Sequence, residues 1–215
     1  MKIGTDGLLL GSWAALEDAD RILDIGTGTG LLALMAAQRN PKASIVAVEI
    51  DEDAAGQAKE NVEISDWYNR ISIKHCPIQK LNVPVSFDHI ISNPPYFSSG
   101  IRSAQKARRT ARHTDSLSLR ELMLHLNRLL SPEGKASLVI PFDQQKTILQ
   151  EAAFFRLFPT RKMLVYPKAG VSPKRLLLEL GRKRVKPIEE EITILEKGEY
   201  STAYQRLTSG FYLKH

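Results

Sequence analysis

The sequence predicts an α/β fold built around a mostly parallel sheet, with helices on both faces. Short apolar runs alternate along the chain with longer amphipathic segments, which is typical of strands connected by helical crossovers. A glycine-rich segment follows the first apolar run, at residues 26–30. Polar residues also follow later apolar runs, and folds of this kind bind ligands at the carboxyl ends of their strands.

The N-terminal part supplies the first elements in order. Residues 7–17 (GLLLGSWAALE) indicate a short amphipathic helix, and residues 21–26 (RILDIG) a buried strand that ends at glycine. A helix is expected over residues 31–40, where an Asn-Pro junction ends it. Residues 44–50 (SIVAVEI) predict a second buried strand. The helix expected over residues 51–65 carries acids in its first turn, where the helix dipole favours them.

The next segments continue the alternation. Residues 71–74 and 87–92 predict two further strands. A helix is expected over residues 118–132, ended by proline, followed by a strand over 134–141 and a helix over 143–154.

Two apolar segments near the C-terminus complete the expected sheet. Residues 162–167 (KMLVYP) and 175–182 (RLLLELGR) are separated by a short loop, which favours an antiparallel pair. We expect one domain over residues 1–215, with an N-terminal helix, a catalytic core over 18–183 and an extension over 184–215.

Composition narrows the class of protein. The chain has 215 residues, of which 43% are hydrophobic and 25% charged, enough for a sizeable core. The single cysteine, Cys76, excludes an internal disulfide framework and favours a reducing, cytoplasmic location. No apolar run is long enough for a membrane span, and no signal peptide is expected at the start. We expect no metal and a monomer.

Positive charge is concentrated in two stretches. The net charge is +6 and the pI about 9.4. Residues 102–113 hold five Lys or Arg and no acid, and residues 161–186 hold nine against one acid. A charge run is usually a solvated face, but two runs of one sign permit a polyanionic partner.

The loop DIGTGTG, residues 24–30, predicts a ligand site. Its glycines allow a tight turn and a close backbone approach to a ligand. The spacing differs from the dinucleotide fingerprint, and Asp24 before the loop disfavours a pyrophosphate. Glu49, at the end of the next strand, is placed to accept hydrogen bonds from a ribose diol. Together these features indicate a nucleoside ligand that is cationic or rich in hydroxyl groups, whereas each alone also fits a plain turn.

The tetrad Asn93-Pro94-Pro95-Tyr96 follows another strand. Its prolines fix the backbone and remove two N–H donors, so Asn93 and the Pro94 carbonyl offer two acceptors for an –NH₂ group. Tyr96 is suited to stacking on a planar substrate. These residue types point to methylation of an amino nitrogen, and the simpler alternative is a Pro-Pro turn with a core tyrosine.

The motifs resemble a known class of enzyme. LDIGTGTG with VAVEID resembles the cofactor-binding half of class I methyltransferases, which use S-adenosylmethionine. That resemblance implies a Rossmann-like, seven-stranded sheet with an antiparallel last strand. The class often carries an acid after strand three to hold the adenine, whereas this chain reads HCPIQ, so Ile78, Gln79 or backbone is expected there. NPPY resembles the motif of enzymes that methylate amino nitrogens in DNA, RNA or protein glutamine.

Longer stretches resemble one bacterial family. MKIGTDGLLLGSW, ARHTDSLS and LTSGFYLK are similar to the tRNA adenine-N6-methyltransferases that modify the adenosine 3′ of the anticodon of a valine tRNA. The family usually has more residues before MKIGTDG, so the chain is read as a short version or as starting at an internal methionine. Alternatives are an amino-group methyltransferase acting on ribosomal RNA, DNA or protein glutamine, and an RNA-binding module without catalysis.

The expected site residues fall into three groups. The catalytic residues are Asn93, Pro94, Pro95 and Tyr96. The cofactor-binding residues are Asp24, Gly26, Thr27, Gly28, Gly30, Glu49, Ile50, Ile78, Gln79, Asn93, Lys2, Thr5 and Asp6. The RNA-binding residues are Phe97, Arg102, Lys106, Arg108, Arg109, Arg112, His113, Lys174 and Arg175, of which Phe97 equally suits the core and His113 a structural role.

Overall fold

A nine-stranded sheet forms the centre of the molecule, in a computed structural model that describes residues 4–84, 86–94 and 117–211. The strand order is β3-β2-β1-β4-β5-β7-β6-β8-β9. The strands are β1 Arg21–Ile25, β2 Ser44–Glu49, β3 Ile71–His75, β4 Phe87–Ser92, β5 Leu130–Pro141, β6 Phe158–Lys168, β7 Arg175–Gly181, β8 Ile188–Glu196 and β9 Glu199–Tyr200. The helices are α1 Thr5–Trp13, α2 Leu31–Arg39, α3 Glu52–Glu63, α5 Leu119–Leu129, α6 Gln145–Phe154 and α7 Thr202–Thr208. Short 3-10 turns are η1 Ile78–Lys80, η2 Phe142–Gln144 and η3 Ser209–Phe211.

Strands β1 to β7 confirm the predicted seven-stranded, mostly parallel arrangement. Strand β1 pairs in parallel with β2 and β4, β2 with β3, and β4 with β5. Strand β7 runs antiparallel to both β5 and β6, as predicted. Strands β8 and β9 extend this sheet beyond β6, and the sequence did not predict them. Only Ile192 of β8 is buried, so that strand lacks the apolar alternation by which strands are recognised.

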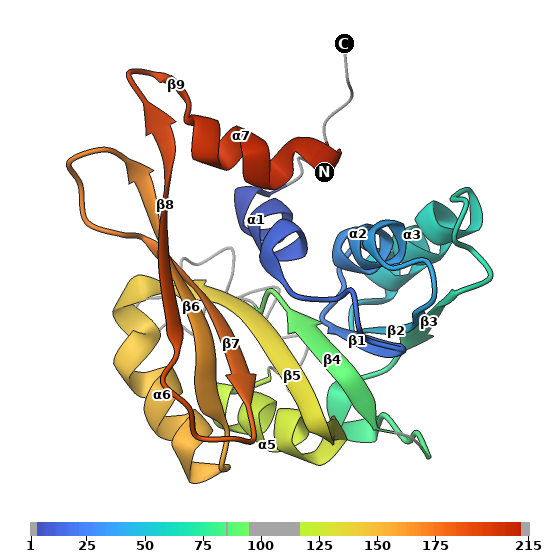
Figure 1. Cartoon of the computed structure of the whole chain (residues 1–215). Helices are drawn as coiled ribbons and strands as arrows, with labels where there is room; N and C mark the ends of the chain where they lie inside the picture. Colours follow the sequence, from blue (N-terminus) through green and yellow to red (C-terminus); the bar gives the residue numbers. More distant parts are fainter. Residues whose placement is uncertain (1–3, 85, 95–116, 212–215) are drawn as a thin grey trace, which may run out of the picture.

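Helices cover both faces of the sheet (Figure 1), and a hydrophobic core lies against each face. One core joins α1, α2 and α7 to the face that carries Ile22, Ile91 and Val139. The other joins α5 and α6 to the face that carries Leu23 and Ile90. Ile22 and Leu23 are consecutive and point to opposite faces of the sheet, and both are fully buried. Because both faces of β1 are covered, apolar residues follow one another in this strand without polar alternation.

The junction between α5 and β5 differs from its prediction. The helix runs from Leu119 to Leu129, and its N-cap Ser118 forms a capping box with Glu121. Strand β5 starts at Leu130 and includes Pro132, which had been expected to end the helix. The register with β4 shifts at this point, so Pro132 lies where the ladder is interrupted and its missing N–H costs little.

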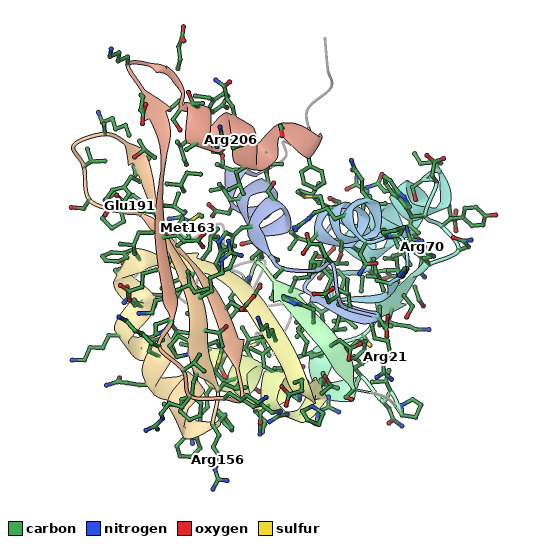
Figure 2. All side chains as sticks on the ribbon, in the orientation of Figure 1. Arg21, Arg70, Arg156, Met163, Glu191 and Arg206 are labelled. Atoms are coloured by element: carbon green, nitrogen blue, oxygen red, sulfur yellow. The ribbon has the colours of Figure 1, made fainter. Side chains whose placement is uncertain are left out.

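Hydrogen bonds from one arginine side chain connect the elements around strands β2 and β3. Arg70, labelled in Figure 2, precedes β3 and donates to the carbonyls of Ala37, Asn40 and Ala43 at 2.7–3.0 Å. These carbonyls belong to the end of α2 and the entry of β2, so one guanidinium connects three elements. Among the helices that the structure describes, none has the length and apolar character needed to cross a membrane.

Candidate active site

The candidate site lies where the strand order reverses, at the carboxyl ends of β1 and β4. The chain leaves β1 toward β2 on one side, while β4 pairs with β1 on the other. The Ser92 hydroxyl, at the end of β4, donates to the Ile25 carbonyl at the end of β1, at 2.8 Å. This bond holds Asn93 beside the glycine loop that follows Ile25. In open α/β sheets such a point is where ligands bind.

The glycine loop has a backbone that only glycine adopts without strain. Gly26, Gly28 and Gly30 have φ values of 70°, 59° and 87°. The amides of Gly26 and Thr27 both donate to the Val48 carbonyl of β2, at 2.9 and 3.0 Å. A Cβ at residue 26 or 28 would meet nothing within 4 Å in the described part of the chain beyond its sequence neighbours, which leaves room there for a ligand.

Asp24 is a buried carboxyl at the base of this loop. Its side chain is fully buried, and its Oδ2 accepts from the Thr27 hydroxyl at 2.5 Å, while its Oδ1 has no hydrogen-bond partner among the described residues. Burial raises the pKa of Asp24 from 3.8 to about 7, against the opposing effect of the Thr27 hydrogen bond. A buried oxygen without a partner suits a ligand that brings a hydrogen-bond donor or a positive charge.

Glu49 holds the other side of the loop. Its Oε2 accepts from the Gly28 amide at 2.8 Å, and its Oε1 accepts from the amides of Ile50 and Asp51 at 2.8 and 3.0 Å. Three backbone donors therefore fix the carboxylate. A carboxylate has about four acceptor positions, so it retains room for about one further hydroxyl without rearrangement.

The segment after β3 forms the third side of the expected cofactor site. His75 contacts the Ile50 carbonyl through Nε2 at 3.1 Å, which ties the end of β3 to the turn after β2. Ile78 is only 4% exposed and belongs to the core beneath η1. Gln79 is exposed. Hydrogen bonds from Ser118, with a smaller contribution from Gln79, lower the pKa of the Glu121 carboxyl at the start of α5.

The predicted catalytic tetrad is described in part. Asn93 is partly exposed and Pro94 is buried. Pro95 and Tyr96 lie outside the described residues, as do Lys2 and the predicted RNA contacts Phe97, Arg102, Lys106, Arg108, Arg109, Arg112 and His113. The roles assigned to all of these residues stay predictions.

A residue predicted to bind RNA and a residue predicted to bind the cofactor contact each other at the sheet edge that holds the carboxyl ends of β4 and β5. Strand β7 starts at this edge, because Arg175 pairs with Pro141 at the carboxyl end of β5. The Arg175 Nε donates to Asp6 Oδ2 of α1 at 2.9 Å, and both side chains are mostly buried. Lys174 beside it is exposed, and so is Thr5. The expected RNA residue Arg175 therefore forms an ion pair with the expected cofactor residue Asp6.

Sequence reasoning missed Ser92 and His75. Ser92 directly precedes the NPPY tetrad, and a hydroxyl at the last position of a buried strand was an available signal. His75 ends the third strand, but its partner is a backbone carbonyl, which carries no signature in sequence. In the described part of the chain, no group of three or more His, Cys, Asp or Glu side chains is arranged to hold a metal ion.

The fold and the site define a class I methyltransferase domain. The family model described as methyltransferase small domain matches residues 3–154. The fold is similar to that of a predicted O-methyltransferase from Agrobacterium tumefaciens, with a TM-score of 0.74, 21% identity and 96% coverage of both chains. It is also similar to a putative RNA methyltransferase from Pyrococcus horikoshii, with a TM-score of 0.58, 16% identity, and coverage of 82% of this chain and 80% of that one.

Curated relatives narrow the class to one family. A tRNA1(Val) (adenine(37)-N6)-methyltransferase from Bacteroides thetaiotaomicron is 46% identical over 215 residues, which is 99% of this chain and 91% of the relative. The protein of the same name from Vibrio vulnificus is 44% identical over 214 residues, covering 100% of this chain and 90% of the relative. The chain belongs to the tRNA1(Val) (adenine(37)-N6)-methyltransferase family.

Proposed function

We propose that this protein transfers a methyl group from S-adenosylmethionine to the N6 amino group of the adenosine 3′ of the anticodon in a valine tRNA. The proposal rests on Asn93 lying beside the glycine loop through the Ser92–Ile25 hydrogen bond, in a chain 46% identical to a relative of that name. A tRNA substrate implies action in the cytoplasm.

The glycine loop and two acids fit the proposed cofactor. The open side of Gly26 and Gly28 allows close approach, and the unpartnered Asp24 oxygen suits the cofactor's positive charge. Glu49 would accept a ribose hydroxyl at its remaining acceptor position. When bound, S-adenosylmethionine supplies an electrophilic methyl group attached to a sulfonium.

The described residue closest to the proposed chemistry is Asn93. The Asn93 side-chain oxygen and the Pro94 carbonyl would accept the two hydrogens of the adenine amino group. These two hydrogen bonds would favour a more tetrahedral amino nitrogen whose lone pair faces the methyl carbon. Asn93 and Pro94 would thus keep the amino group oriented toward the methyl group that the cofactor supplies, and the proton that the amino group loses would pass to solvent. Tyr96 would stack on the adenine and limit its motion.

Basic side chains would position the tRNA. The run from Arg102 to Arg112 follows the tetrad in sequence, and exposed Lys174 lies at the same edge of the sheet as Asn93. Such residues contact phosphates flanking a base turned out of a loop. Anticodon loops present unpaired bases, so little energy is needed to extrude the target.

The decisive experiment is mass spectrometry of nucleosides from tRNA after incubation with the purified protein and S-adenosylmethionine. We expect N6-methyladenosine in valine tRNA and none in a transcript with the target adenosine replaced by guanosine. Methylation of a glutamine-containing peptide or of ribosomal RNA alone would instead support another amino-group methyltransferase. Absence of S-adenosylhomocysteine binding in calorimetry would support an RNA-binding module.

A further inference from the structure

We propose that Asn61 of α3 is a positioning residue for cofactor binding, because it sets the conformation of the glycine loop. The inference rests on the proposed use of that loop to hold S-adenosylmethionine. Asn61 lies two residues before the end of α3, far from the loop in sequence. Its side-chain Nδ2 donates to the Thr29 carbonyl at 2.8 Å. The orientation of this amide is chemically required, since only its NH₂ group can donate to a carbonyl.

The bond fixes one end of a peptide unit whose other end is also held. The Thr29 carbonyl accepts from Asn61, and the amide of the same peptide, Gly30 N–H, donates to the Thr27 carbonyl at 3.0 Å. A peptide unit is planar, so fixing both polar ends fixes its rotation. Gly30 has a φ of 87° and is the N-cap of α2, so this peptide determines where the loop ends and the helix begins.

The neighbouring peptide depends on it. The Thr27 carbonyl that accepts from Gly30 belongs to the same peptide unit as the Gly28 amide, which donates to Glu49 Oε2 at 2.8 Å. A chain of contacts therefore runs from α3, through the loop backbone, to the carboxylate proposed to hold the ribose. Rotation of the Thr29–Gly30 peptide would weaken the next contact along this chain.

Helix α3 packs at this position for a separate reason. A Cβ at residue 30 would lie 3.5 Å from Ala58 Cβ, so Gly30 faces α3 one turn before Asn61. Residues three apart lie on one face of a helix, which places Ala58 and Asn61 together against the loop. Asn61 supplies the polar contact of that face, and small Ala58 allows the approach.

The test compares two Asn61 variants with a packing control on the same helix. Asn61→Ala removes the donor, and Asn61→Asp keeps the shape but places an acceptor against the Thr29 carbonyl. Val62→Ala trims a neighbouring side chain that is 4% exposed and packs in the core. Calorimetry gives the Kd of S-adenosylhomocysteine, steady-state assays give KM for each substrate, and thermal unfolding gives Tm.

We expect the Kd to rise about 3- to 10-fold in Asn61→Ala, the scale of one lost hydrogen bond, and at least as much in Asn61→Asp. The KM for S-adenosylmethionine should rise while the KM for tRNA stays constant. Val62→Ala should lower Tm at least as much as Asn61→Ala and leave the Kd within about twofold.

Two results would overturn the proposal. One is a Kd in both Asn61 variants within about twofold of wild type. The other is a Val62→Ala variant that loses as much affinity per degree of Tm as Asn61→Ala, because Asn61 would then act only through helix stability. Wild-type protein that binds no S-adenosylhomocysteine would count against the proposed function itself, so the two failures are distinguishable.

Discussion

Replacing Asp24 with asparagine should change how stability depends on pH in the cofactor-free protein. Burial raises the pKa of Asp24 from 3.8 to about 7. Between these values the folded protein holds a proton on Asp24 that the unfolded chain has released. The folded state binds more protons, so the free energy of unfolding falls as pH rises from about 4 to about 7. The pKa difference corresponds to a loss of about 4 kcal/mol, since each pH unit contributes about 1.4 kcal/mol.

His89 has the opposite effect over nearly the same range. It is buried against Ser137, at 2.9 Å from the hydroxyl, and burial lowers its pKa from 6.5 to about 4. The unfolded chain gains this proton as pH falls below 6.5 and the folded protein does not, which costs about 3 kcal/mol by pH 4. The two contributions therefore nearly cancel in wild type. Asp24→Asn removes the Asp24 contribution, so the free energy of unfolding of this variant should rise with pH because of His89 alone.

Urea unfolding at pH intervals from about 4 to about 8 measures this effect. The wild-type free energy minus that of Asp24→Asn should fall by about 4 kcal/mol across the range. S-adenosylmethionine should stabilise wild type more at high pH, because its positive charge favours the ionised Asp24. His89→Gln is the matched control and should steepen the decline of stability with rising pH. Parallel curves for wild type and Asp24→Asn would refute the assignment of a raised pKa to Asp24.

Three further predictions concern the site. Asn93→Ala should lower kcat by about 10²–10³, the scale of one preorganised hydrogen bond, with the KM for tRNA unchanged; a large rise in that KM would assign Asn93 to substrate binding instead. Glu49→Gln should weaken S-adenosylhomocysteine binding by about 10- to 100-fold and lower Tm, because an amide cannot accept from donors on both sides; calorimetry with wild-type affinity would contradict this. Replacing Arg108, Arg109 and Arg112 together with alanine should raise the KM for tRNA. The slope of log KM against log salt concentration should become shallower by about 0.7–0.9 per lost phosphate contact, and an unchanged slope would identify a solvated face.

The sequence predicted those strands whose side chains are buried on both faces of the sheet or form a clear apolar run. Strand β1 is recognisable because Ile22 and Leu23 belong to opposite cores, and the β6–β7 pair because each strand contains a run of apolar residues, 163–165 and 176–178. Strand β8 was missed since five of its nine side chains are exposed and only that of Ile192 is buried. Its place in the sheet comes from pairing with β6, from Arg161↔Ile188 to Lys168↔Leu195, and backbone pairing leaves no pattern in the sequence.

The sequence by itself determined the components of the candidate site: the glycine loop, the acids at strand ends and the Asn-Pro-Pro-Tyr tetrad. These are local, since each depends on residue type within a few positions of a strand end. Only the tertiary structure decided how they meet. The bond from Ser92 to Ile25 spans 67 residues, and that from Asn61 to Thr29 spans 32. Such contacts depend on strand order and on helix packing against the sheet, and these arise from the whole chain burying its apolar surface at once.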